Sequence, residues 1–127
     1  MSVVGQVVEH LEYLGYEVEQ DGEVYRARHT SKWDLVVRDY KGGVLIVTWL
    51  GTNEYAKQER LEYLEFINGL NGKAAVARFY ADEDMDLVME AFFGGEYDRV
   101  RFGEFMESWD EDTGMKLVLS GAEKYLQ

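Results

Sequence analysis

The stretch LEYLEFINGLNGKAAVARFY, from Leu61 to Tyr80, changes its hydrophobic period part-way along. Before Asn71-Gly72 the apolar residues recur every third position, which indicates a helix, and afterwards they alternate as in a strand. We therefore expect a helix to end at this corner and a strand to begin there. The stripe that we expect the helix to bury consists of Leu61, Leu64, Ile67 and Leu70.

The chain after this corner predicts a hairpin followed by helices. A strand is expected over residues 73–80, then an acidic turn at Asp82–Asp86, then an antiparallel strand over residues 87–93. A third helix is expected over about residues 97–110, although Val100 to Phe102 could instead extend a strand. Asp112-Thr113-Gly114 is expected to interrupt the helix before a closing, helical segment over residues 115–126.

The chain before the corner predicts one helix and four strands. Apolar spacing indicates a helix over residues 2–14 with Ser2 as its N-cap, and Asp21-Gly22 is a hairpin turn signal. A second strand pair is expected over residues 33–39 and 44–50. The latter run is almost continuously apolar, which is typical of a central strand, and Thr52 or Asn53 can cap the helix that follows.

These elements predict an α+β fold, with an antiparallel sheet backed by helices. The expected order is one helix, four strands, one helix, two strands and one helix. A length of 127 residues is common for a single domain, so we expect residues 1–127 to form one.

The composition disfavours several classes of partner. With 25 Asp and Glu against 13 Lys and Arg, the net charge is -12, so phosphate backbones and anionic membrane surfaces would be repelled. The absence of cysteine excludes disulfides and thiolate chemistry. The N-terminal residues lack a basic region before their apolar pattern, so we expect no signal peptide and a cytoplasmic location.

No catalytic or metal-binding constellation can be read from the residues. His10 and His29 are far apart and lack cysteine neighbours, which favours structural or surface roles. The acidic runs at Asp82–Asp86 and Asp110–Asp112 fail the EF-hand pattern, because Leu87 stands where the first would need glycine. We therefore expect solvated turns, no metal, no cofactor and no enzymatic activity.

Aromatic residues are numerous for a domain of this size, with nine Tyr, six Phe and three Trp. Most can belong to the core, but aromatics are also enriched at protein-binding surfaces. The candidates for a protein-binding or dimer face are Trp33, Trp49, Phe92, Phe93 and Trp109.

The corner also resembles a known family. The sequence FINGLN at residues 66–71, followed by a strand ending in an aromatic residue, an acidic turn and an apolar strand, resembles the YbjN-like family of bacterial candidate sensory-transduction regulators. The resemblance implies a type III secretion chaperone-like fold and a role in binding proteins rather than in catalysis. It implies structural roles for Asn68 and Asn71, which with Gly72 form the motif at the corner.

Three functional hypotheses follow. The first is a non-enzymatic binding module, chaperone-like or regulatory, that holds an extended protein segment or forms a homodimer. The second is a genuine type III secretion chaperone. The third, from another class, is a small carboxylate-based hydrolase or ligand-binding enzyme, which a pocket enclosing several buried acids would favour.

Overall fold

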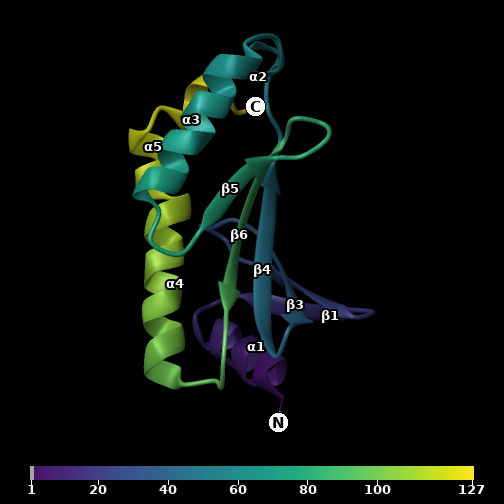
Figure 1. Ribbon diagram of the computed structural model, residues 1–127. Coiled ribbons are helices and arrows are strands. Elements are labelled where there is room, and N and C mark those ends of the chain that lie inside the picture. The colour runs from purple at the N-terminus through teal and green to yellow at the C-terminus, as the bar shows by residue number, and fades with distance from the viewer. Residues whose placement is uncertain (1) are drawn as a thin grey trace. The chain divides into compact units, whose positions relative to one another are not determined.

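A computed structural model describes residues 2–127 and has an α+β fold with a six-stranded antiparallel sheet. The strand order is β1-β2-β3-β4-β6-β5 (Figure 1). The strands are β1 (Glu17–Asp21), β2 (Val24–Arg28), β3 (Leu35–Tyr40), β4 (Gly43–Leu50), β5 (Arg78–Ala81) and β6 (Leu87–Phe93). The helices are α1 (Val3–Tyr13), α2 (Glu54–Gln58), α3 (Arg60–Lys73), α4 (Arg99–Thr113), α5 (Met115–Leu119) and the 3₁₀ helix η1 (Ala122–Lys124). The predicted fold class and strand order along the chain are confirmed.

The chain divides into two compact units. Unit 1 comprises residues 2–48 and 91–107, and unit 2 comprises residues 49–90 and 108–127. The divisions fall inside β4, β6 and α4, so each of these elements contributes to both units. Within residues 2–127, no helix is both long and apolar enough to cross a membrane.

Unit 1 follows its local sequence signals closely. The Ser2 hydroxyl accepts a hydrogen bond from the Gly5 N–H at 3.1 Å and caps α1, as predicted. The β1–β2 turn is Gly22-Glu23, one residue later than Asp21-Gly22, because Asp21 pairs with Val24; Gly22 has a φ of 64°. Helix α1 packs on β1 and β3.

Unit 2 contains the predicted corner, and two of the expectations there are wrong. The single helix expected before the corner is divided at Glu59 into α2 and α3, and α3 runs through Gly72 to Lys73. The side chain of Asn53 caps α2 by accepting from the Ala56 N–H at 2.9 Å, as predicted. Figure 1 shows α3 beside both β5 and α5.

The predicted apolar stripe of this helix is also wrong in part. Leu61 is 71% exposed and Leu64 is exposed as well, whereas α3 buries Tyr63, Ile67 and Leu70. In a helix, residues three apart differ by about 300° around the axis, so a stripe with this constant spacing drifts away from the buried face. Residues spaced alternately by four and three, such as Tyr63, Ile67 and Leu70, stay on one face.

The C-terminal half of unit 2 is more helical than expected. Helix α4 continues to Thr113, so Asp112 lies in its last turn rather than in a solvated turn. The closing segment then returns to the start of α2: the Asn53 N–H donates to the Tyr125 carbonyl at 2.9 Å, and the Gln127 N–H donates to the Gly51 carbonyl at 3.1 Å.

The corrected stripe can be tested by paired substitutions. We expect Ile67→Ala to lower the free energy of unfolding by about 2–4 kcal/mol, because it opens a cavity beneath α3. Leu61→Ala should change it by less than about 0.5 kcal/mol, because Leu61 is exposed. Urea unfolding measures both values, and equal losses would contradict the assignment of the buried face.

Candidate functional site

The five candidate binding residues are divided between surface and core. Trp33, Trp49 and Phe92 are 41%, 51% and 46% exposed. Phe93 and Trp109 are buried, which corrects their prediction as surface residues, and the three exposed aromatics are divided between unit 1 (Trp33 and Phe92) and unit 2 (Trp49). Phe93 packs edge-on against Phe102 and Phe105 of α4, with ring centroids 5.1 and 5.3 Å apart. Alternation along β6 explains the difference, since neighbouring residues point to opposite faces of a sheet.

The strand register of unit 1 defines the face on which Phe92 lies. Directly paired residues of antiparallel strands share a face, and Val24, Arg38 and Leu45 are paired in succession across β2, β3 and β4. We call the side of β2, β3 and β4 that carries Phe92 the open strand face; its arginines and Phe92 are exposed, whereas Leu45 and Val47 of β4 are buried. Its residues are Val24, Arg26, Arg28, Val36, Arg38, Tyr40, Gly43, Leu45, Val47 and Phe92.

The helical segments of unit 1 pack on the opposite face. Alternation places Leu35 and Val37 there, both almost fully buried, and Phe93 reaches α4 from the same side. The contacts of α1 and α4 therefore lie on the face opposite to Arg28, Arg38 and Phe92, and these three side chains are exposed.

An aromatic pair lies at the end of the open strand face, beside the turn that joins β3 to β4. The rings of Tyr40 and Phe92 meet edge to face, with centroids 5.9 Å apart. The guanidinium carbon of Arg38 and the ammonium nitrogen of Lys41 each lie 5.3 Å from the centre of the Tyr40 ring. Two cations thus flank an aromatic surface, which is a cation–π arrangement. This group was not predicted from the sequence, although the turn at Lys41-Gly42 would have indicated it by fixing the register of the hairpin.

The corner in unit 2 is held by a buried carboxylate. Asp112 accepts hydrogen bonds from the backbone N–H groups of Ala75, Val76 and Ala77 at 2.8–3.0 Å, and Lys116 donates to it at 3.0 Å. Burial by itself raises the pKa of Asp112, but these donors outweigh it and lower the pKa below its usual value.

The two asparagines of the motif differ in their surroundings. The Asn71 amide donates to the Phe79 carbonyl at 2.9 Å and accepts from the Phe79 N–H at 2.8 Å. Asn71 thus makes with β5 the two hydrogen bonds that a neighbouring strand would make. It does not end the helix in the left-handed conformation that was predicted. Asn68 is exposed, and nothing in the structure explains a role for it. Gly72 lies inside α3 with open space where a Cβ would project.

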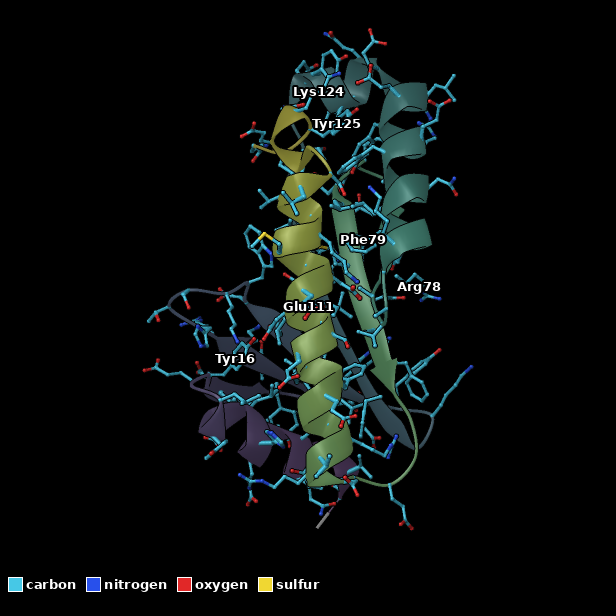
Figure 2. All side chains as sticks on the ribbon, turned by 90° about the vertical axis from the view of Figure 1, so that its left-hand side faces the viewer. Tyr16, Arg78, Phe79, Glu111, Lys124 and Tyr125 are labelled. Atoms are coloured by element: carbon cyan, nitrogen blue, oxygen red, sulfur yellow. The ribbon has the colours of Figure 1, made fainter. Side chains whose placement is uncertain are left out.

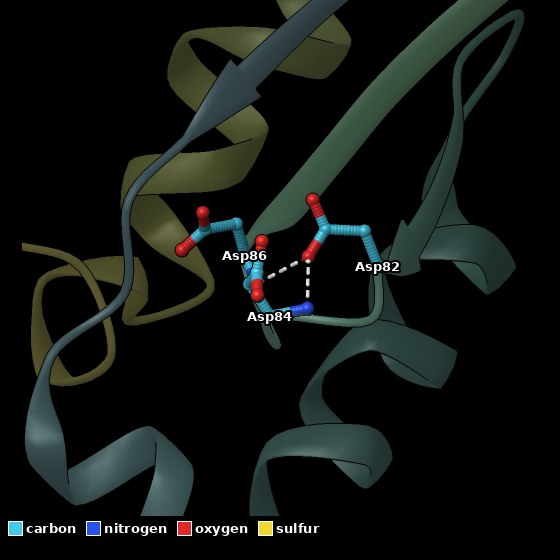
Figure 3. A group of neighbouring side chains, drawn as sticks. All are labelled: Asp82, Asp84 and Asp86. Atoms are coloured by element: carbon cyan, nitrogen blue, oxygen red, sulfur yellow. Dashed lines mark hydrogen bonds between the residues drawn. The ribbon is translucent and has the colours of Figure 1, made fainter.

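The acidic turn brings three carboxylates together. Single oxygens of Asp82, Asp84 and Asp86 lie within 4.8 Å of one another (Figure 3). One oxygen of Asp82 accepts from the Asp84 and Asp86 N–H groups at 2.9 and 3.0 Å, and the Thr52 N–H donates to Asp86 at 3.3 Å. These bonds explain the arrangement as a stabilised turn, with Met85 at a φ of 65°.

A second group of titratable side chains fixes the C-terminal segment of unit 2. The Glu62 carboxylate accepts from the hydroxyls of Tyr55 and Tyr125 at 2.8 and 2.7 Å, and Lys124 lies 3.0 Å away. Figure 2 shows Lys124 and Tyr125 together at the end of the chain. Burial, followed by the hydrogen bond to Glu62, raises the pKa of Tyr125 to about 12. This group stabilises the fold of the tail.

His10 has a structural partner in unit 1. Its Nδ1 shares a hydrogen bond of 2.7 Å with the Tyr97 hydroxyl, and its ring meets Phe102 edge-on. Burial, and then the positive charge of Arg99, lower the pKa of His10. The predicted structural reading of this histidine agrees with its surroundings.

Comparison with solved structures decides the fold. The crystal structure of YbjN from E. coli, described as a candidate transcription regulator, superposes with a TM-score of 0.76 over 97% of this chain and 94% of that chain. This chain has the fold of YbjN. The sequence identity to YbjN is 13%, so the likeness concerns the backbone. No protein-family model matches the sequence, and no curated protein matches it.

Asp112 gives a prediction for stability and its pH dependence. We expect Asp112→Asn to lower the free energy of unfolding by about 3 kcal/mol at neutral pH, because Lys116 loses its buried counter-charge. The pKa of Asp112 is lower in the folded chain than in the unfolded chain. The carboxylate therefore contributes fully to stability above its unfolded pKa of about 3.8, and this contribution is lost as pH falls towards the folded pKa. Urea unfolding against pH should show a shallower acidic decline in the variant.

The matched control is the neighbouring residue Glu111, which is exposed on α4 (Figure 2). Glu111→Gln removes the same charge and should leave stability within about 0.5 kcal/mol. Equal effects of the two substitutions would show that the Asp112 hydrogen bonds do not hold the corner.

His10 should give the free energy of unfolding a second pH dependence. As with Asp112, stability is expected to decline as pH falls. Because the folded pKa of His10 lies below its unfolded value of 6.5, the unfolded chain takes up the proton first as pH falls. Stability should be constant with respect to this group above pH 6.5 and should decline below it. Thermal unfolding of His10→Gln should lack this decline between about pH 5 and 6.5. An unchanged slope would contradict the assignment.

Proposed function

We propose that this chain is a non-enzymatic protein-binding module of YbjN-like type, chaperone-like or regulatory, that holds a segment of another protein. The observation that carries the proposal is the exposure of large aromatic side chains on strands, at Trp49 and Phe92. Exposed aromatic surface is unfavourable in water unless a partner covers it, and aromatic residues are enriched at protein interfaces.

The disposition of the acidic groups supports a binding role over the hydrolase alternative. The carboxylates with the most hydrogen bonds, those of Asp112, Glu62 and Asp82, each accept from groups of their own chain. A general acid or base needs a free proton-transfer position facing a substrate. These three groups instead stabilise a corner, a tail and a turn.

The likeness to YbjN supports the regulatory form of the proposal, because YbjN is described as a candidate transcription regulator. We extend a regulatory role to this chain on the basis of fold alone, which is an argument by analogy. A cytoplasmic location and the capacity to form a homodimer remain predictions from the sequence.

Affinity capture from the native cytoplasm, combined with light scattering, tests this function. We expect specific proteins to be enriched by the wild-type chain, and expect Trp49→Ser or Phe92→Ser to lose at least one of them, because each removes a large contact surface. Leu119→Ser, which alters an apolar residue on α5 that is more exposed than either aromatic, is the control and should retain them.

Two results would contradict the proposal. One is the absence of any enriched protein together with a strictly monomeric chain. The other is a set of partners that neither aromatic substitution alters. A change from dimer to monomer in either variant would assign its aromatic side chain to a homodimer interface.

A further inference from the structure

Charge on the side of unit 1 that includes the open strand face and the neighbouring strand β1 is sorted by strand. The register pairs Glu17 with Arg28 and Glu19 with Arg26, so these four side chains project from the same side of unit 1. The acids of this side, Glu17, Glu19 and Asp21, all lie on β1. Strands β2, β3 and β4 contribute arginines and apolar residues to it and no acid. A chain of net charge -12 thus presents a locally positive surface.

Most of these cations lack a carboxylate partner. Arg26 forms an ion pair with Asp21 at 2.9 Å. Within residues 2–127, Arg28, Arg38 and Lys41 form no ion pair, and the last two lie over the Tyr40 ring instead. Asp39 lies between Arg38 and Tyr40 in sequence, but alternation along β3 directs it to the opposite face. The positive charges are therefore available to an external group.

The apolar part of the face adjoins these charges. Phe92 is about half exposed and contacts Tyr40, while Val24 and Val36 are half-buried between the arginines. Nearer the edge, a hollow of about 170 Å³ is lined by Glu17, Val18, Glu19, Arg26 and Arg28. Apolar side chains and cations without an ion pair therefore lie next to each other on this face. The hollow lies where the arginines of β2 meet the acids of β1.

We propose that the open strand face of unit 1 binds an acidic, extended segment of another protein. Carboxylates of the segment contact Arg28, Arg38 and Lys41, and an apolar side chain covers Tyr40 and Phe92. This inference rests on the proposed protein-binding function and specifies the chemistry of the partner.

The segment lies across the face and does not extend the sheet at β1. Strand β1 is an edge of the sheet, but its three acids would stand against the carboxylates of such a partner. The net negative charge of the chain does not prevent binding, because at physiological salt the screening length is about 8 Å and nearby charges dominate. Local complementarity therefore selects an acidic ligand.

Fluorescence anisotropy at physiological salt tests the proposal with labelled peptides of alternating leucine and glutamate, leucine and serine, or leucine and lysine. We expect the glutamate peptide to bind most tightly. The double variant Arg38→Glu, Lys41→Glu should weaken its binding on the order of tenfold or more, because two attractions become repulsions. Arg38→Gln, Lys41→Gln serves as the test if the charge-reversed chain fails to fold by circular dichroism.

The matched control makes the same charge change in unit 2. Lys57→Glu, Arg60→Glu replaces two exposed cations of α2 and α3, and it should change binding of the glutamate peptide by less than about twofold. A loss equal to that of the Arg38 and Lys41 variant would show an effect of net charge alone and would overturn the proposal.

The remaining outcomes separate this inference from the proposed function. Tighter binding of the serine or lysine peptide would leave a protein-binding module with another partner chemistry, and would overturn the acidic-segment assignment. Binding of none of the peptides overturns it as well, while affinity capture still decides the function. Preferential binding of a labelled DNA duplex, or a change from dimer to monomer in the Arg38 and Lys41 variant, would assign the face to a nucleic acid or to a second copy.

Discussion

The carboxylate of Asp112 holds the corner of unit 2 through backbone groups that lie 35 to 37 residues away in sequence. Between Lys73, where α3 ends, and Arg78, where β5 begins, the chain is in neither helix nor strand, so its N–H groups need other acceptors. One carboxylate serves three of them and is itself paired with Lys116. Lys116 also donates to the Lys73 carbonyl at 3.1 Å, which links the end of α3 to the same group. The direction of β5, and with it the position of the hairpin, depends on this cluster.

The same principle recurs along the neighbouring elements, where polar side chains replace missing secondary-structure partners. Strand β5 lies at an edge of the sheet, and the Asn71 amide supplies one donor and one acceptor to Phe79. Asp82 closes the acidic turn, and Glu62 fixes the tail. Each of these side chains resembles a functional residue in sequence. In the structure each forms hydrogen bonds with groups of its own chain. A binding function is therefore expected at exposed surfaces rather than at these residues.

Those exposed surfaces differ from what the net charge suggests. A net charge is a sum over the chain, whereas a binding partner meets the residues of one face. The register of the first three strands collects acids on β1 and arginines on β2 and β3. Cation–π contact with Tyr40 keeps Arg38 and Lys41 beside an apolar surface rather than beside a carboxylate. The resulting combination of charge and aromatic area supports the proposed binding role, and it occurs on a fold shared with YbjN.

The sequence by itself determined the α+β class, the order of the elements, the caps at Ser2 and Asn53, and the resemblance to the YbjN fold. These features depend on neighbouring residues, because capping and alternation act within one turn or one strand pair. Only the tertiary structure decided that Phe93 and Trp109 are buried, that Leu61 is exposed and that Asp112 is a buried anchor. It also decided which cations share a face with Phe92. These outcomes depend on contacts between residues far apart in the sequence, and such contacts follow from packing and register rather than from local pattern.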